Sequence, residues 1–429
     1  MTQALPATAR PPRKDLIKAF VASLSGTSLE WYDFAAYSVA SALVFGQLFF
    51  PSHDPLSGTL LAFSTYAVGY VSRPLGGFVF GRLGDVLGRK QVLVITLLVT
   101  GISTVFIGLL PTHDQVGSLG AVLLVILRFA QGVGIGGEWG GAVLLSSEFG
   151  SDKHRGFWAS AAQIGPPAGN LMANGVLAVL AATLTQEQFM SWGWRVAFLL
   201  SAVLVIFGMW IRVKLEETPV FKELQEKGEQ AGAPVREVFT REPRALVAAI
   251  LSRVGPDVLY ALFTVFVLTY ATQQLDVPKS WAVTGVMLGS TLQLFLMPLA
   301  GALSDRLGRR RVYAVGAIGA AVWPFVFFPM VQGGSAPLLI IGVIVGLVWH
   351  ALMYGPQAAF VSEQFSPALR STGSSLAYTL AGVIGGALAP LLFTALFAHF
   401  ETWMAPAFYL LATCVVTLIG LTLGRRDAQ

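Results

Sequence analysis

Long apolar runs separated by short polar segments make up most of the chain. Twelve runs are long enough to form membrane-spanning helices, which need about 20 mostly apolar residues. These predicted spans cover residues 19–43, 58–81, 91–110, 119–147, 157–183, 196–213, 244–272, 281–302, 311–331, 336–363, 371–397 and 403–423. The pattern predicts an all-α membrane protein with twelve transmembrane helices.

The longest polar stretch, residues 214–243, is rich in Glu, Lys and Gln and falls midway between spans six and seven. It predicts a cytoplasmic linker, partly helical, between two six-helix bundles at 19–213 and 244–423. Residues 1–18 and 424–429 are predicted to be cytoplasmic tails. The apolar run behind the first tail is too long for a signal peptide, so we expect it to remain as the first span.

Composition agrees with a membrane protein. Hydrophobic residues make up 55% of the 429 residues and charged residues 12%, against about 25% charged residues in soluble domains. So little charge excludes a cytosolic enzyme, a nucleic-acid binder and a disordered chain. The single cysteine, Cys414, excludes a disulfide framework and a cysteine zinc site. Because the sequence has no metal-ligand spacing, phosphate-binding loop or nucleophile elbow, we expect no catalytic residue, metal or cofactor, and transport driven by a proton gradient.

The 28 lysine and arginine residues predict the orientation. With both termini in the cytoplasm, Arg195 and Lys279 fall on the outer side, Arg73, Arg128 and Arg253 lie inside spans, and the others face the cytoplasm. This distribution predicts a multi-pass membrane protein with both termini on the cytoplasmic side. It also explains the net charge of +5 without a nucleic-acid partner.

Two sets of charged residues occur in both halves. The motif G-x3-D-x2-G-R-[KR] lies between spans two and three and again between spans eight and nine. Its residues are Gly81, Asp85, Gly88, Arg89 and Lys90 in the first copy and Gly301, Asp305, Gly308, Arg309 and Arg310 in the second. The second set is Glu148 and Arg155 after span four, and Glu363 and Arg370 after span ten. Their matching positions indicate a duplicated six-span unit with pseudo-symmetric halves.

A gating role is the hypothesis for these repeated residues. The aspartates are expected to accept hydrogen bonds from helix N-terminal amides or to pair with a basic residue, and Gly88 to form a tight turn. A charged cluster between helices stabilises one state, and its rupture permits another. The alternative is a loop that only obeys the positive-inside rule, which the second copy makes less favoured.

Charged residues inside spans are costly and therefore predict function. Glu30 and Asp33 share one face of span one near its middle, with Tyr37 one turn further. Two carboxylates so close are hard to ionise together, so we expect one of them to couple transport to a proton. Arg128 of span four is expected to bind a substrate carboxylate or to pair with Glu30 or Asp33. The alternative for each of these residues is a purely structural ion pair.

Other candidate substrate-binding residues lie in spans five, seven and ten. Arg253 and Asp257 are four residues apart beside a proline, and form either a self-neutralising pair or a site for an anionic group. Gln163, Asn170 and His350 could supply uncharged hydrogen bonds. For the histidine, the alternative is a satisfied polar group with no further role.

Glu138 lies in a glycine-rich run of span four. We interpret the glycines as a smooth face for helix packing and not as a nucleotide-binding loop, because the run lies inside a membrane span. Glu138 is predicted either to face the central cavity or to pair with an arginine at a helix interface, such as Arg73. Both residues are assigned to the gating set.

The twelve spans, the duplicated loop motif and the central linker resemble the major facilitator superfamily over almost the whole chain. Further motifs resemble its metabolite–proton symporter branch. They are Glu30-Trp-Tyr-Asp33-Phe34, Arg73-Pro-Leu-Gly-Gly77, Arg128-x2-Gln131-Gly132, Gly136-Gly-Glu138-Trp-Gly-Gly141, Trp192-Gly-Trp-Arg195 and Glu217-Thr-Pro-x-Phe221.

The resemblance implies a monomeric carrier in the lipid bilayer that takes up a small metabolite with a proton by alternating access. Members of the branch import shikimate, 2-oxoglutarate, citrate, other small carboxylates, and proline or betaine. One alternative stays open, because Gly165-Pro-Pro-Ala-Gly169 fits a short signature of drug–proton antiporters. A transporter-like sensor is less favoured because it is expected to carry an added soluble signalling domain. A channel fits the duplicated gating loops less well.

Overall fold

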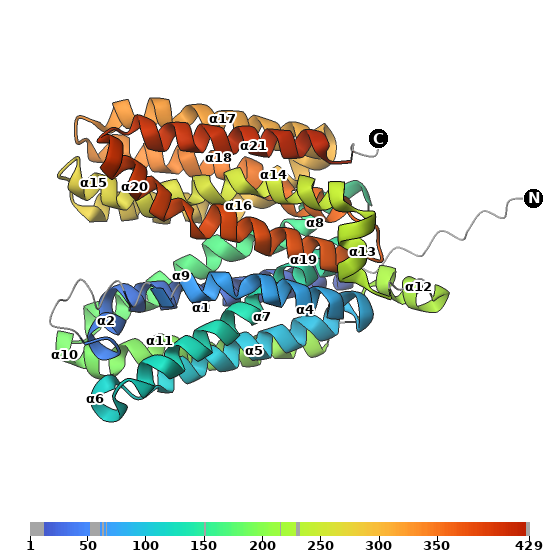
Figure 1. The fold of residues 1–429 in the computed structure, drawn as a ribbon, viewed down its shortest axis with the longest axis horizontal. Helices are drawn as coiled ribbons and strands as arrows, with labels where there is room; N and C mark the ends of the chain where they lie inside the picture. Colours follow the sequence, from blue (N-terminus) through green and yellow to red (C-terminus); the bar gives the residue numbers. More distant parts are fainter. Residues whose placement is uncertain are drawn as a thin grey trace, which may run out of the picture.

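The computed structural model describes residues 13–51, 61, 64–65, 67–149, 152–214, 216–228 and 232–425. Its regular structure over these residues is helical, and the helices form two bundles that lie side by side (Figure 1). Helices α1 to α11 form the first bundle, coloured blue to green, and α14 to α21 form the second, coloured yellow to red. The first and second bundles correspond to the two predicted halves.

The first bundle begins at α1. Its elements are α1 (Arg13–Ala40), η1 (Ser41–Phe45), α2 (Gly46–Leu48), α4 (Arg73–Val86), α5 (Arg89–Leu109), α6 (His113–Val116), α7 (Leu119–Phe149), η2 (Asp152–His154), α8 (Arg155–Ala159), α9 (Ala161–Thr183), α10 (Gln186–Gln188), η3 (Phe189–Gly193) and α11 (Trp194–Val213). Two short helices, α12 (Pro219–Lys227) and α13 (Pro234–Arg241), follow in the linker.

The second bundle repeats this arrangement with fewer short elements. Its elements are α14 (Pro243–Ala261), η4 (Leu262–Phe266), α15 (Val267–Gln273), α16 (Lys279–Leu307), α17 (Arg309–Val331), α18 (Ala336–Glu363), α19 (Arg370–Ala381), η5 (Gly382–Ala387), α20 (Ala389–Phe400) and α21 (Met404–Leu423).

Ten helical stretches of the described chain are long and apolar enough to cross a membrane. The other two predicted spans correspond to α1, which carries charges at its start and its middle, and to α4, which has 14 residues. Part of the predicted span 58–81 lies outside the described residues. The observed ends differ by several residues: α1 begins at Arg13, inside the predicted tail, and α16 continues to Leu307.

The linker is helical in two places. Thr218 starts α12 by accepting a hydrogen bond from the Phe221 N–H (3.3 Å), and Gly228 ends it with a φ of 64°. Proline stands at the first turn of both α12 and α13, where its missing N–H costs nothing. The linker is therefore more ordered than the polar sequence alone suggests.

Glycine is required at both copies of the loop motif. Gly88 has a φ of 113° and Gly308 a φ of 94°, and residues other than glycine rarely adopt this backbone conformation. Each glycine ends one spanning helix and starts the next, α4 to α5 and α16 to α17. The expected tight turn is therefore present in both halves.

Other glycines allow helices to approach closely. A Cβ atom at Gly136 of α7 would collide with the carbonyl oxygen of Arg73 on α4. A Cβ atom at Gly165 would collide with Thr27, and one at Gly169 would lie 2.5 Å from the carbonyl oxygen of Ser28. The glycines of the Gly165-Pro-Pro-Ala-Gly169 motif thus serve packing of α9 on α1, which removes the specific reason to favour drug export.

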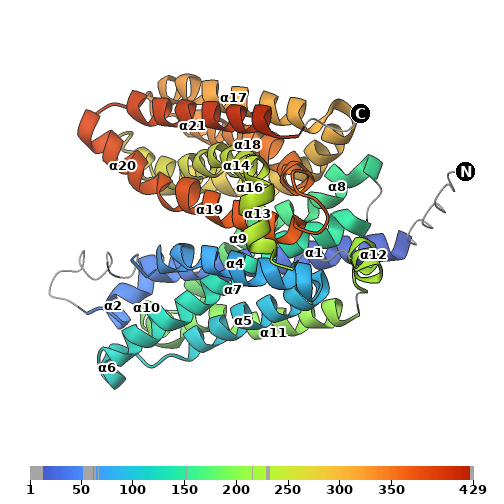
Figure 2. The same cartoon turned by 45° about the vertical axis from the view of Figure 1, so that its right-hand side comes forward.

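The two ends of the molecule differ. The linker helices α12 and α13, the short helix α8 and the end of α21 lie together at one end, here called the linker end (Figures 1 and 2). The short elements α2, α6 and α10 lie at the opposite end, here called the far end. Both copies of the loop motif, which follow α4 and α16, are at the linker end.

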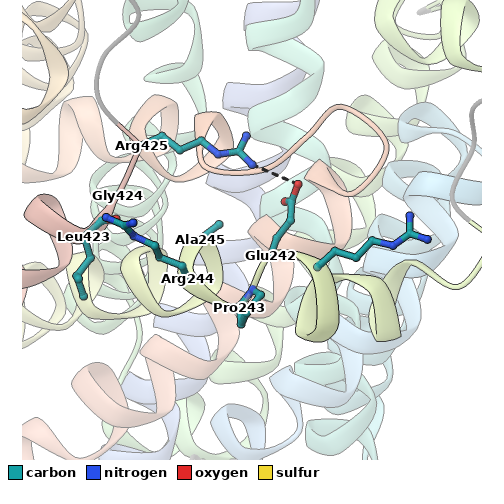
Figure 3. Close-up of a pocket in the computed structure, with 8 residues that line it drawn as sticks. Glu242, Pro243, Arg244, Ala245, Leu423, Gly424 and Arg425 are labelled. Carbon is teal, nitrogen blue, oxygen red and sulfur yellow. Dashed lines mark hydrogen bonds and ion pairs between the residues drawn. The ribbon is translucent and has the colours of Figure 1, made fainter.

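A hollow of ≈ 400 Å³ opens at the linker end where α13, α14 and the turn after α21 meet (Figure 3). The Arg244 Nε atom donates to the carbonyl oxygen of Leu423 (2.9 Å). Arg425 forms an ion pair with Glu242 (3.3 Å). The hollow lies at the surface of this end and contains none of the predicted substrate-binding residues.

Candidate functional site

Asp33 is buried in the middle of α1 and is held by hydroxyl groups. Its carboxylate accepts hydrogen bonds from Ser201 of α11 (2.5 Å) and Thr104 of α5 (2.8 Å). The Thr104 hydroxyl accepts from Gln131 Nε2 (2.8 Å), and Gln131 Oε1 accepts from Arg128. Arg128 therefore reaches Asp33 through two intervening side chains, and not by the direct pairing considered from the sequence.

Aromatic rings of α1 cover the guanidinium group of Arg128. Its Cζ atom lies 4.0 Å from the ring centre of Tyr37 and 4.4 Å from that of Phe34, both within the range of a cation–π contact. The Tyr37 hydroxyl forms a 2.5 Å hydrogen bond with Thr65. These contacts hold α1 and α7 together at the depth of Asp33.

Glu138 pairs with an arginine, but not with the expected one. Its carboxylate forms an ion pair with Arg212 of α11, and both side chains are 1% exposed. Arg212 also donates to the carbonyl oxygen of Leu93. The predicted pairing of Glu138 with an arginine at a helix interface is therefore confirmed, but the partner is Arg212 and not Arg73. Arg212 lies at the end of α11, from where its long side chain reaches back into the bundle.

Arg73 instead packs on aromatic rings. Its Cζ atom lies 4.3 Å from the ring centre of Tyr70 and 4.5 Å from that of Phe34. Its Nε and Nη2 atoms are buried and have no hydrogen-bond partner among the described residues. Arg73 is thus positioned at mid-depth with donors to spare.

In the second bundle, Arg253 and Asp257 form the ion pair that their spacing allows, with Nε and Oδ2 3.1 Å apart. The Cζ atom of Arg253 lies 3.5 Å from the ring centre of Tyr378. Tyr378 in turn stacks on Trp139 of the first bundle, with ring centres 4.3 Å apart. The arginine pair is therefore placed directly at the interface between the two halves.

Two residues of α9 connect the halves. Gln163 accepts a hydrogen bond from Trp139 Nε1 (2.9 Å) and donates to the carbonyl oxygen of Tyr354 (2.9 Å). Asn170 donates to the Tyr260 hydroxyl (2.7 Å). Both predicted substrate-binding residues therefore lie at the interface, with Gln163 already engaged on both sides.

His350 is buried within the second bundle. Its Nδ1 atom is 2.9 Å from Nε2 of Gln293, and its ring stacks on Tyr354 with centres 4.8 Å apart. These contacts match the alternative of a satisfied polar group. Its ring centre also lies 5.1 Å from that of Tyr260, next to the Asn170 contact.

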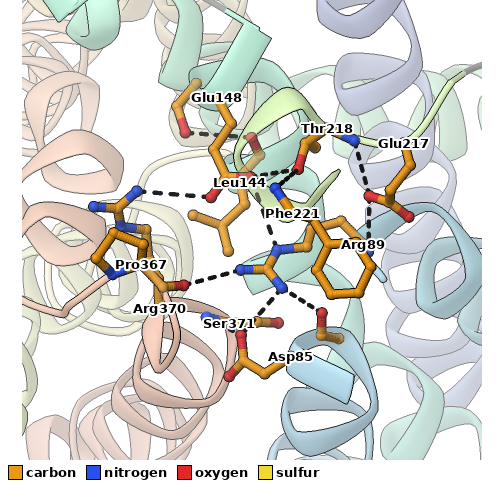
Figure 4. A network of polar contacts seen from close by, with 12 residues as sticks. Asp85, Arg89, Leu144, Glu148, Glu217, Thr218, Phe221, Pro367, Arg370 and Ser371 are labelled. Carbon is orange, nitrogen blue, oxygen red and sulfur yellow. Dashed lines mark hydrogen bonds and ion pairs between the residues drawn. The ribbon is translucent and has the colours of Figure 1, made fainter. Parts of the chain in front are cut away.

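The motif aspartate of the first half closes the linker end (Figure 4). Asp85 accepts hydrogen bonds from the backbone N–H groups of Ser371 (3.2 Å) and Thr372 (2.9 Å), at the start of α19 in the other bundle. Arg89 forms an ion pair with it at 3.2 Å. Both expected kinds of partner, amides at a helix N-terminus and a basic residue, are present together.

Asp305 makes the equivalent contact from the second half. It accepts hydrogen bonds from the backbone N–H groups of Gly156 (2.8 Å) and Phe157 (3.0 Å), at the start of α8 in the first bundle. Arg309 forms an ion pair with it. Each half therefore caps a helix of the other half with a carboxylate, which the helix dipole favours.

The repeated glutamates complete these clusters. Glu148 lies 3.7 Å from Arg370 of the other bundle and 3.8 Å from Arg89. Glu363 lies 3.3 Å from Arg309. Together with Arg155 at the start of α8, these residues are placed at the linker end, so the two repeated sets form one gate region.

The linker adds contacts that sequence reasoning missed. The Glu217 carboxylate accepts hydrogen bonds from the backbone N–H groups of Arg89 and Lys90, both at 3.1 Å. The Thr218 hydroxyl donates to Glu148 at 2.6 Å (Figure 4). The sequence signal for these contacts is the Glu217-Thr-Pro-x-Phe221 motif, which from sequence alone serves only as evidence of family resemblance.

Comparison with known proteins identifies the family. The model of the Major Facilitator Superfamily matches residues 20–390 and 279–426. The chain belongs to this superfamily. The superfamily fold, two six-helix bundles, is also that of the proton:xylose symporter XylE. The match with that structure covers 95% of this chain and 95% of XylE, with a TM-score of 0.77 and 18% sequence identity.

Curated members of the superfamily are more similar in sequence. The inner membrane metabolite transport protein YhjE of Escherichia coli K12 is 38% identical over 95% of this chain and 93% of its own. The shikimate transporter of the same organism is 37% identical over 96% and 95%. Its proline/betaine transporter is 33% identical over 95% and 83%. These relatives are transporters and not enzymes.

Proposed function

We propose that the chain is a proton-coupled symporter that takes up a small metabolite by alternating access. The metabolite is a carboxylate of the shikimate or dicarboxylate kind, or a zwitterion of the proline or betaine kind. The curated relatives support this choice, since their names include shikimate and proline/betaine transport.

The reciprocal aspartate caps carry the proposal. Asp85 and Asp305 each bind backbone amides of the opposite bundle, so a few polar contacts close the linker end between the two bundles. Such contacts break and re-form as units, which permits two discrete arrangements. An alternating-access carrier needs this property.

The proton gradient supplies the energy, without a further cofactor. With a zwitterionic substrate, one net positive charge moves inward and gains about 2.3 kcal/mol per 100 mV of membrane potential, which corresponds to about fortyfold accumulation. With a monocarboxylate, uptake with one proton moves no net charge and is driven by the pH difference. A carboxylate of α1, Glu30 or Asp33, takes up the proton. Both are at mid-depth, 2% and 3% exposed.

The proposed setting is the bacterial inner membrane with the linker end in the cytoplasm. The basic residues of the linker and of both motif copies then obey the positive-inside rule. The carrier works as a monomer in the lipid bilayer, and its partners are the metabolite and the proton.

The test is the external pH of a weakly buffered, de-energised suspension of vesicles that contain the protein. Shikimate, 2-oxoglutarate, citrate, proline and betaine are added singly, with empty vesicles as control. Alkalinisation by one compound is the expected result, and it also names the substrate class. A folded protein that gives no signal with any of them would contradict the proposal.

Replacing the coupling carboxylate separates coupling from transport. We expect the amide variant at that position to lose proton-driven accumulation while exchange of substrate for substrate survives, because exchange needs no change in protonation. The measurement is uptake and counterflow for Glu30→Gln and Asp33→Asn in vesicles. Full accumulation in both variants would contradict the assignment to α1.

A further inference from the structure

Three buried charged residues at mid-depth keep polar atoms without a hydrogen-bond partner in the described chain. They are both carboxylate oxygens of Glu30, Nε and Nη2 of Arg73, and Nη1 of Arg253. Their residues are 2%, 3% and 4% exposed. Unsatisfied buried charges are destabilising, so three together point to a role other than stability.

Residues of both bundles meet at this depth, where Trp139 of α7 stacks on Tyr378 of α19 beside Arg253. Glu30 of α1 lies within electrostatic range of Arg73 of α4 and Arg253 of α14. Asp257, the ion-pair partner of Arg253, lies within range of Arg73 as well. A negative group bound between the two arginines would therefore touch both bundles, as a transported substrate must.

The surroundings of Glu30 contain further charged and titratable groups. They are Asp33 one turn along α1, Glu138 on α7, Arg212 on α11 and Tyr378 on α19. Glu138 and Arg212 neutralise each other in an ion pair. Arg253 is also paired, with Asp257, but its Nη1 atom has no hydrogen-bond partner among the described residues. The donors left for an anion at this point are therefore this atom and the two atoms of Arg73.

Asp33 differs from Glu30 in its partners. Both Asp33 oxygens have a hydroxyl donor, from Ser201 and Thr104, and these donors belong to the first bundle alone. The charge of Asp33 is thus accommodated whether or not substrate is bound. The charge of Glu30 has no such fixed donors, so it responds to what else is bound nearby.

We propose that Arg73 and Arg253 bind the carboxylate of the substrate, and that Glu30 is the competing anion, which must take up a proton before that carboxylate binds. The proposal rests on the proposed symport and deepens it. Two anions a few ångströms apart in a low-dielectric site repel strongly. Proton uptake by Glu30 removes one negative charge and the substrate carboxylate restores it, so one proton enters with each carboxylate and no net charge is carried.

The same geometry selects the substrate class. Aromatic rings of Tyr378 and Trp139 lie beside Arg253, and Tyr70 lies beside Arg73. They suit an uncharged body attached to the carboxylate. The ammonium group of a zwitterion would meet two guanidinium groups and a protonated Glu30, and the carboxylate beside them, Asp257, is already paired with Arg253. The site is therefore built for a small monocarboxylate such as shikimate, in preference to betaine or proline.

The decisive experiment measures the dissociation constant of shikimate at several pH values for the purified protein in lipid nanodiscs. In the wild type we expect it to rise tenfold per pH unit once Glu30 loses its proton. Glu30→Gln should remove this dependence, whereas Asp33→Asn, which removes the other candidate carboxylate of α1, should keep it. Persistence of the dependence in Glu30→Gln, or its loss in Asp33→Asn alone, would overturn the proposal.

Two further measurements test the arginines and the charge balance. Arg73→Gln and Arg253→Gln should each weaken shikimate binding about 10- to 100-fold, as expected for the loss of a charged hydrogen bond, and the uncharged methyl ester of shikimate should bind the wild type as weakly. Accumulation driven by a fixed pH difference should be the same when the membrane potential is clamped at different values. An ester that binds as tightly as the acid, or potential-driven uptake, would count against the site.

A substrate-free measurement covers variants that bind poorly. Infrared difference spectra between low and high pH should contain a C=O band of protonated carboxyl groups, and the part of this band that belongs to Glu30 should be present in the wild type and Asp33→Asn and missing in Glu30→Gln. An unchanged band in Glu30→Gln overturns the proposal. Vesicles whose wild-type protein moves no proton with any tested compound overturn the symport itself, whereas intact coupling in Glu30→Gln overturns only the role of Glu30.

Discussion

The two gate clusters at the linker end are built from the same residue types but differ in burial. In the first, the side chains of Asp85, Arg89 and Glu148 are all 0% exposed. In the second, Arg309 is 9% and Glu363 is 27% exposed. The inter-bundle caps are equivalent, so the difference arises from what covers them.

The cover comes from the segment that follows the sixth span of each half. Lys90 donates to the carbonyl oxygen of Val213 (3.1 Å), and Arg310 makes the matching bond to Gly424. Beyond this shared contact, the first half continues into the linker. There the ring centre of Phe221 lies 5.2 Å from the Cζ atom of Arg89. A duplicated unit thus became asymmetric because the linker follows only one copy.

The largest expected effect separates the two aspartates. Asp85→Asn should destabilise the state closed at the linker end by about 3 kcal/mol, since it leaves Arg89 with less neutralisation in a fully buried site. Asp305→Asn should cost about 1.5 kcal/mol, the loss of a charged hydrogen bond, because the glutamate that remains with Arg309, Glu363, is 27% exposed and admits solvent to the cluster.

The measurement is the distance distribution between spin labels at exposed Leu87 and Leu307, in a background where buried Cys414 is replaced by alanine. Asp85→Asn should populate a longer distance far more than Asp305→Asn does. Equal populations in the two variants would show that burial does not set the strength of the gate.

A smaller contrast is expected for the glutamates. Glu148→Gln removes a buried carboxylate that faces Arg89, Arg370 and the Thr218 hydroxyl, and should lower the thermal unfolding temperature by several degrees. Glu363→Gln alters a partly exposed pair and should lower it by less than half as much, because solvent screens such pairs. Thermal scans of the purified variants in one detergent compare them directly, and a reversed order would contradict the burial argument.

The sequence predicts the fold well because bilayer thickness imposes one requirement on every span, a long apolar run. It also predicts both aspartate caps, since the repeat shows which residues recur at matching positions. It does not predict Arg212 as the partner of Glu138. Their pairing depends on a side chain that turns back into the bundle, and a charge near a helix end reads as cytoplasmic.

The mid-depth cluster was also predicted only in part. Glu30, Asp33 and Arg128 stand out because charge in a span is rare. The hydroxyls of Ser201 and Thr104, which hold Asp33, carry no such signal, because serine and threonine are common in spans and often bond their own backbone. Which of two carboxylates receives them is decided by the packing of three helices.

Removing the hydrogen bonds between the linker and the first gate cluster tests the comparison between the two clusters. Glu217→Gln should cost about 1 kcal/mol, the usual value of a helix cap, and should make the Asp85 cluster behave more like the Asp305 cluster. The expected readout is an about fivefold faster rate of hydrogen exchange at the start of α5, with the start of α17 as the internal control. Unchanged exchange at Arg89 and Lys90 would mean that Glu217 does not support the first gate.

The smallest effect is expected at the outermost pair of the second half. Arg425 is 55% exposed and pairs with Glu242, at the edge of the hollow in Figure 3. Arg425→Ala should change the free energy of unfolding by less than about 1 kcal/mol, because solvent weakens such a pair. The backbone N–H of Arg425, which donates to Gln364 (2.6 Å), is kept in the variant. If thermal unfolding and uptake fell as far as in Glu217→Gln, the segment after α21 would brace its gate as the linker does, and the asymmetry between the halves would disappear.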